Sequence, residues 1–302
     1  MTQETILILD LGSQYTQLIA RRVRELGVFS EIVRFDMSAE DLKARSPKGV
    51  ILSGGPASVY EQHSPQIDAA LLEIGVPVLG ICYGLQSLIE HTGGTVEPAP
   101  GREYGRAVAT VNTSNPLFKG VSKETTVWMS HGDRVVGVEE SWESIATTGS
   151  SPFAAAAHRS QPLYGVQFHP EVHHSAEGKT IVANFVTGIC GCSGDWKMAS
   201  FIDETVAHIR EQVGDDGRVV CGLSGGVDSA VTALIVDRAI GDRLSCIFVD
   251  NGVLRQDEVE EVEAAFRPIF GDRLSVVRAG DSFLEQLKGV TDPEVKRKRI
   301  GH

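Results

Sequence analysis

Short apolar runs alternate with stretches of helical periodicity along the first hundred residues. Buried strands are predicted at residues 6–9, 30–35, 50–52 and 76–81. Helices are predicted at residues 15–26, 67–74 and 85–91. Buried strands that alternate with helices indicate a mostly parallel open sheet covered on both faces, so the fold class is α/β.

The chain divides near residue 195, and a second alternation of strands and helices begins at residue 218. Before the division, the first half continues with shorter strand-like runs at residues 107–111, 126–128 and 163–168, followed by a helix at residues 178–186. A glycine-rich segment, residues 188–194, precedes an amphipathic helix at 198–213 and strands at 218–223, 244–249 and 274–277. We therefore expect two domains, residues 1–194 and 195–302.

Composition limits the classes of function. The chain has 302 residues, 42% of them hydrophobic, and a net charge of −12. An acidic chain is a poor candidate for binding nucleic acid or an anionic membrane, so neither is expected as a partner. The N-terminus has no basic region, and residues 6–9 are too short an apolar run for a signal peptide or a membrane span. We expect a cytoplasmic protein.

Cysteine is sparse and odd in number, with five residues at positions 82, 190, 192, 221 and 246. This usage favours a reducing compartment without a disulfide framework. Cys190 and Cys192 could belong to a metal site, but no second pair completes four ligands. A loop of small residues is the favoured interpretation.

Cys82 follows an apolar strand and precedes a helix, with Gly80 and Gly84 on either side. This is the pattern of a nucleophile elbow with cysteine in place of serine. The helix N-terminus favours the thiolate form of such a cysteine. A buried structural cysteine is the alternative for this motif taken alone.

His169 and Glu171 supply possible partners at the end of the strand predicted at residues 163–168. Residues i and i+2 of a strand point the same way, so both side chains can face one site. Histidine can exchange a proton with the cysteine, and the carboxylate can orient the imidazole. A surface turn is the alternative.

Another strand ends in glycines, at Gly54 and Gly55. Their N–H groups can form half of an oxyanion hole, and the N–H of Tyr83 can form the other half. An ordinary turn at Gly54 and Gly55 is the alternative.

A phosphate-binding loop is predicted between the strand at residues 218–223 and the helix that follows it. Glycines expose backbone N–H groups to an anion, and the helix N-terminus adds partial positive charge. A Walker motif is absent, because the loop contains no lysine. A glycine-rich turn without a ligand is the alternative. The loop consists of Ser224, Gly225, Gly226, Val227, Asp228 and Ser229.

The two sets of motifs resemble two known families. Cys82, His169 and Glu171, with residues 52–56 before them, are similar to the triad of class I glutamine amidotransferases, whose domain is flavodoxin-like. Residues 224–229 resemble the pyrophosphate loop of the ATP pyrophosphatases, of the adenine-nucleotide α-hydrolase-like fold. The two sets of motifs in one chain resemble the glutamine-hydrolysing GMP synthetase family, and the resemblance extends over essentially the whole chain. It includes residues 8–17, 127–133, 248–255 and 292–299.

The resemblance implies a role for each matching residue of the first domain. Cys82 would be the nucleophile, His169 the acid and base, and Glu171 its orienting carboxylate. Gly55 and Tyr83 would donate to the oxyanion. The polar groups of glutamine would meet Gln86, Ser130 and His131, although His131 could equally be a satisfied loop histidine.

The resemblance also implies ATP and Mg²⁺ in the second domain. Residues 224–229 with Ala230 would hold the ATP phosphates, and Asp228 would lie near Mg²⁺. Val249 and Asp250 would lie beside the adenosine, at the end of the next strand. ATP would adenylate xanthosine monophosphate (XMP), and ammonia from glutamine would then displace AMP to give GMP.

Members of that family continue beyond the position of residue 302 into a C-terminal dimerisation domain and form homodimers. We expect this chain to lack that domain, and we expect the 302 residues alone to hydrolyse glutamine without making GMP. A protein that acts only as a glutaminase is one alternative function. A non-catalytic partner that binds glutamine or nucleotide is another.

Overall fold

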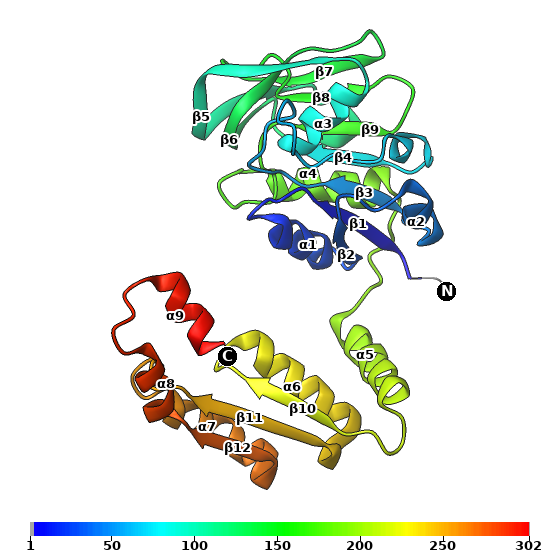
Figure 1. Cartoon of the computed structure of the whole chain (residues 1–302). Helices are drawn as coiled ribbons and strands as arrows, with labels where there is room; N and C mark the ends of the chain where they lie inside the picture. Colours follow the sequence, from blue (N-terminus) through cyan, green and yellow to red (C-terminus); the bar gives the residue numbers. More distant parts are fainter. Residues whose placement is uncertain (1–2, 302) are drawn as a thin grey trace. The chain divides into compact units, whose positions relative to one another are not determined.

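The computed structural model describes residues 3–301 and divides the chain into two compact units, Met1–Lys197 and Met198–His302. Each unit has its own β-sheet with helices packed on it (Figure 1). The predicted α/β class is confirmed.

The first unit contains a nine-stranded sheet in the order β2-β1-β3-β4-β9-β8-β7-β5-β6. Strands β2, β1, β3, β4 and β9 are parallel, as predicted, and the remaining four extend the sheet with antiparallel pairing. The extension is larger than its short apolar runs indicated, because β5 and β6 have 17 and 14 residues. The strands are β1 (Thr5–Asp10), β2 (Phe29–Arg34), β3 (Gly49–Leu52), β4 (Val78–Ile81), β5 (Thr95–Val111), β6 (Glu124–Gly137), β7 (Trp142–Thr147), β8 (Ala155–His158) and β9 (Leu163–Val166).

The helices of this unit differ from the prediction in two places. The segment expected at residues 67–74 is only a short 3₁₀ helix, capped at its start by the Asp68 side chain. Helix α2 was not predicted, since its six residues are too few to show a period. The helical elements are α1 (Thr16–Glu25), α2 (Ala39–Ala44), η1 (Ala69–Glu73), α3 (Tyr83–His91), η2 (Pro116–Phe118), α4 (Gly178–Ala183) and the π-helical η3 (Asn184–Ile189).

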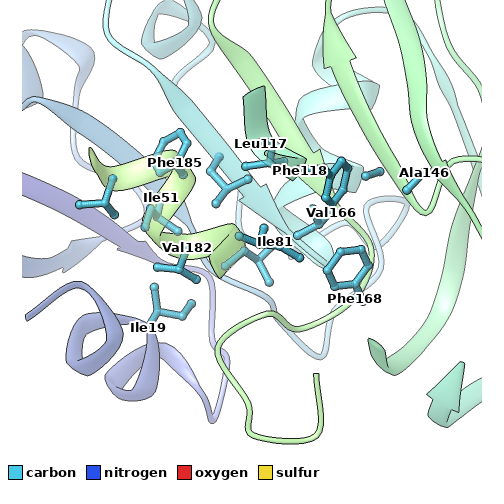
Figure 2. Packing of buried hydrophobic residues seen from close by; sticks show 14 of the residues in the cluster. Ile19, Ile51, Ile81, Leu117, Phe118, Ala146, Val166, Phe168, Val182 and Phe185 are labelled. Atoms are coloured by element: carbon cyan, nitrogen blue, oxygen red, sulfur yellow. The ribbon is translucent and has the colours of Figure 1, made fainter. Parts of the chain in front are cut away.

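Two apolar layers cover the two faces of the parallel strands. In β1, Ile6 and Ile8 belong to one buried cluster and Leu7 and Leu9 to the other, because successive side chains point to opposite faces. Figure 2 shows the first cluster, where α1 and α4 contribute side chains that face the sheet. The second cluster contains side chains of α2, η1 and α3.

The second unit has a parallel sheet in the order β10-β11-β12. Its core joins Leu223, Leu244, Phe248 and Phe270, which are all nearly inaccessible to solvent. The strands are β10 (Val219–Leu223), β11 (Leu244–Asp250) and β12 (Leu274–Arg278), and the helices are α5 (Met198–Val213), α6 (Val227–Ile240), η4 (Gly241–Arg243), α7 (Glu258–Phe270), η5 (Gly271–Arg273), α8 (Gly280–Leu287) and α9 (Pro293–Ile300).

Helix α3 packs on the sheet at backbone distance. A Cβ atom at Gly80 would lie 2.5 Å from the Gly84 backbone, and a Cβ atom at Gly84 would lie 2.5 Å from the carbonyl oxygen of Leu52 in β3. Neither approach can be relieved by a side-chain rotation, since the opposing atoms are backbone. Both positions therefore require glycine.

We predict that Gly84→Ala lowers the free energy of unfolding of the first unit by about 1–3 kcal/mol, the cost of an overpacked contact. Urea denaturation followed by circular dichroism measures the change. Gly149→Ala is the control, because its Cβ would meet nothing within 4 Å, and such a surface change stays within about 0.5 kcal/mol. Equal unfolding free energies for the two variants would contradict this packing.

Candidate active site

Cys82 lies in the tight turn between β4 and α3. Its backbone has φ 52° and ψ −106°, a left-handed conformation that is strained for a residue with a Cβ. The turn is fixed on both sides, because the Cys82 N–H donates to Val166 O at 2.7 Å and its carbonyl accepts from the Gln86 N–H at 3.2 Å. The sulfur thus lies at the carboxyl end of the parallel strands and at the start of a helix, where an anion is stabilised.

His169 and Glu171 form a buried pair beside this turn. The imidazole Nδ1 lies 2.8 Å from Glu171 Oε1, and the two residues are 4% and 0% exposed. The sequence predicts that they face one site through strand alternation, but β9 ends at Val166 and both residues lie in the turn beyond it. The His169 backbone is instead held by hydrogen bonds, from its N–H to Trp128 O at 3.0 Å and from Ser175 Oγ to its carbonyl at 2.6 Å.

The electrostatics favour a charged imidazole. Burial alone would lower the pKa of His169, but the Glu171 carboxylate and the hydrogen bond with the Cys82 side chain outweigh burial and raise that pKa well above its usual value. With Nδ1 directed at Glu171, the other ring nitrogen is left for the sulfur. This arrangement is suited to holding a proton next to a cysteine and releasing it to a leaving group.

A cavity of about 530 Å³ opens onto the sulfur. Its wall combines the loop after β1, the loop after β3, the start of α3 and the β5–β6 hairpin. The other predicted residues Gly54, Tyr83 and Glu171 do not line this cavity, although a Cβ at Gly54 would be 3.1 Å from the His169 ring. The predicted site residues in the wall are Gly55, Cys82, Gln86, Ser130, His131 and His169.

His131 is not a loop histidine, because it lies within β6 and is only 4% exposed. Its Nε2 lies 3.1 Å from Glu103 Oε2, on the paired strand β5. Burial lowers the pKa of His131, and the Glu103 carboxylate opposes this shift. Glu103 was missed in the sequence, since it becomes a neighbour of His131 only through the pairing of β5 with β6.

Gln167 was also missed. Its side chain is fully buried, and its Nε2 lies 3.7 Å from the Cys82 sulfur. The signal in the sequence was an amide within an apolar run, two positions before His169. A buried amide needs polar partners, and here they belong to the site.

In the second unit, the predicted phosphate loop joins β10 to α6. Gly225 has φ +72°, and the hydroxyl groups of Ser224 and Ser229 lie 3.0 Å apart. Helix α6 begins at Val227, so Asp228, Ser229 and Ala230 lie in its first turn rather than in the loop.

A cavity of about 390 Å³ lies beside this loop. Of the predicted ATP residues, Ser224 and Val249 are in its wall, together with the apolar side chains of Leu223 and Phe248. Asp250 is not in the wall, and its Oδ1 accepts the Gly252 N–H at 2.9 Å. The structure thus brings one end of the loop and the end of β11 to one cavity.

Within residues 3–301, no group of three or more His, Cys, Asp or Glu side chains is arranged to hold a metal ion. No helix in the same range combines the length and apolar composition needed to cross a bilayer.

Comparison with known families decides what the first unit is. Residues 7–189 match the family model described as glutamine amidotransferase class-I. The chain belongs to this family. Residues 200–277 match a second model, described as NAD synthase.

Relatives of this amidotransferase confirm the predicted resemblance. A curated protein of Caldanaerobacter subterraneus, named GMP synthase [glutamine-hydrolyzing], is 53% identical over 300 residues, which are 99% of this chain and 58% of the relative. A relative from Acetivibrio thermocellus with the same name is 52% identical, and the match covers 100% of this chain and 59% of the relative. The chain thus spans a little under three fifths of the length of these relatives.

A solved structure from Thermoplasma acidophilum, provisionally assigned as one subunit of a GMP synthase, matches with a TM-score of 0.55 and 33% identity. It covers 63% of this chain, and the match includes 96% of the solved chain. The matched fold therefore makes up nearly the whole of that solved chain.

We predict that Glu171→Gln lowers the pKa of His169, because the buried imidazolium loses its counter-charge. NMR titration of the histidine ring protons measures the shift, with His158 on β8 as a reference that stays unchanged. A raised pKa means that His169 stabilises the fold below its unfolded value of about 6.5, and that this stabilisation is lost as the pH rises through the folded value. An unshifted His169 titration in the variant would contradict the role of Glu171.

Proposed function

We propose that the first unit hydrolyses glutamine to glutamate and ammonia, with Cys82 as nucleophile, His169 as acid and base and Glu171 as orienting carboxylate. The observation that carries the proposal is the buried His169–Glu171 pair, 2.8 Å between Nδ1 and Oε1, next to a cysteine at the start of a helix. A cavity of about 530 Å³ gives the substrate access to the sulfur.

The reaction proceeds in two halves. The Cys82 thiolate attacks the side-chain amide carbon of glutamine, and the N–H groups of Gly55 and Tyr83 stabilise the oxyanion. The His169 imidazolium gives its proton to the amide nitrogen, so that ammonia leaves and a γ-glutamyl thioester remains. Neutral His169 then takes a proton from water as the water attacks the thioester, and glutamate departs with the thiolate restored.

The cavity wall provides polar groups for the rest of the substrate. Ser130 and His131 on β6 and Gln86 on α3 face the same space as the sulfur. Gln86 already uses its amide N–H groups on Asp133 O and Gln167, so its free contribution to glutamine is the carbonyl oxygen. Gly54 lies close to the His169 ring, so a side chain at this position would press on the imidazole.

We predict that Cys82→Ala reduces glutamine hydrolysis at least ~1000-fold, because the covalent route is lost. Glutamate release in a coupled assay measures the rate. Cys221→Ala, in the second unit, is the matched control and retains the activity. Glutamine hydrolysis at the unaltered rate in Cys82→Ala would rule out this nucleophile.

We propose in addition that the ammonia serves GMP synthesis, as the names of the relatives indicate. ATP adenylates the C2 oxygen of XMP and releases pyrophosphate, and ammonia then displaces AMP to give GMP. Residues 224–230 would hold the ATP phosphates, with Val249 and Asp250 near the adenosine. The homodimer and the cytoplasmic location stay predictions.

The residues of the loop fit a Mg²⁺ ion that is held mainly by ATP. Asp228 is an exposed carboxylate in the first turn of α6. Within residues 3–301 it does not belong to any cluster of three ligating side chains. Mg²⁺ commonly takes one or two carboxylates together with phosphate oxygens and water. Asp228 would therefore contribute one ligand, and the bound metal would neutralise phosphate charge.

We predict that Asp228→Asn weakens binding of the Mg²⁺–ATP complex about tenfold, which corresponds to the loss of one charged ligand contact of about 1.4 kcal/mol. Calorimetric titration with and without Mg²⁺ measures both affinities, and the affinity for metal-free ATP does not fall. Asp242→Asn, at a fully exposed position of the same unit, is the control. Equal effects of the two variants would remove Asp228 from the metal site.

A further inference from the structure

Three polar contacts connect the backbone of β6 to the reactive sulfur. Gln86 Nε2 donates to Asp133 O at 2.8 Å and to Gln167 Oε1 at 3.3 Å. Gln167 Nε2 in turn lies 3.7 Å from Cys82 Sγ. Gln86 is 3% exposed and Gln167 is 0% exposed, so water does not compete for these groups.

The direction of this chain of contacts is fixed by its first member. A backbone carbonyl can only accept, so Gln86 must turn its NH₂ group toward Asp133 O. The same nitrogen faces Gln167, which must therefore accept through Oε1. The NH₂ group of Gln167 is then the one that faces the sulfur.

The sulfur meets different groups in its two protonation states. As a thiol, it can donate to Ser130 O at 3.7 Å. As a thiolate, it has nothing to donate, and the carbonyl becomes an unfavourable neighbour. Three groups favour the thiolate: the His169 ring, the N-terminus of α3 and the Gln167 N–H. The Glu171 carboxylate raises the pKa of His169, and the Tyr15 ring contacts the imidazole edge-on, with ring centroids 5.5 Å apart. The Glu103–His131 pair faces the same cavity through His131.

We propose that Gln167 is a hydrogen-bond donor to the Cys82 thiolate and that Gln86 is a positioning residue that holds the Gln167 amide in the donating orientation. The proposal deepens the glutaminase function and rests on Cys82 as its nucleophile. The donor compensates for the Ser130 carbonyl, which lies 3.7 Å from the same sulfur. In a buried site, an unpaired thiolate would lose its hydration without replacement.

The test is the pH dependence of Cys82 alkylation by iodoacetamide in the full chain, read peptide by peptide with mass spectrometry. Only the thiolate reacts, so the midpoint of the rate profile reports thiolate formation. Burial raises the pKa of Cys190, and it raises the pKa of Cys192 to about 11, so these thiols react at higher pH. No glutamine is present, and the result is therefore independent of turnover.

Gln167→Met keeps the side-chain volume and removes the donor without changing charge. We expect it to move the midpoint upward by about one pH unit, the loss of one hydrogen bond to a charged group. Gln86→Met leaves Gln167 in place but frees its orientation, and we expect a smaller shift in the same direction. Gln161→Met, at an exposed turn, leaves the midpoint where it is in the unaltered chain.

An unchanged or lowered midpoint in Gln167→Met overturns the donor role. A shift in Gln167→Met without any shift in Gln86→Met overturns the positioning role of Gln86. Should Gln167→Met fail to fold, the absence of a shift in Gln86→Met overturns the proposal. Failure of the glutaminase itself would have a different result, since the alkylation profile would persist while glutamine hydrolysis would be absent from the unaltered chain.

Discussion

The left-handed backbone of Cys82 depends on the close contact between helix α3 and the parallel strands. A non-glycine residue in such a conformation costs of order 1–3 kcal/mol. The helix offsets that cost by burying Leu85, Leu88 and Ile89 completely, each contributing about 1.5–3 kcal/mol. Because Gly80 and Gly84 have no Cβ, the helix can approach the strands closely enough to bury these side chains and to hold Cys82 in its strained turn.

This contact also determines where the partners of the cysteine lie. The Cys82 N–H donates to Val166, the last residue of β9, which is the strand paired with β4. The turn that carries His169 therefore starts next to the turn that carries the sulfur. The antiparallel extension then reaches the site from the other side, because Trp128 in β6 holds the His169 backbone and Ser130 faces the sulfur. Strands β5 and β6 are thus part of the site.

The sequence predicted the parts of the site that depend on local pattern. The strands around Cys82 and the glycines beside it follow from apolar runs and from the need for a tight turn. His169 and Glu171 were paired correctly, but strand alternation was the wrong reason, since both lie beyond β9. Glu103 could not be predicted, because the β5–β6 register is a product of tertiary packing. Gln167 left only an indirect signal, an amide within an apolar run, and its contact with the sulfur depends on packing.

Burial separates the chemistry of the two units. In the first, the charged groups His169 and Glu171 are removed from water and paired before any substrate arrives, and such preorganised charge acts strongly in a low dielectric. In the second, Ser224 and Asp228 are exposed, and residues 224–229 include no lysine or arginine. ATP with its metal would bring the positive charge itself. The charged pair of the first unit is therefore preorganised by its own fold, whereas the loop of the second unit has no basic side chain of its own.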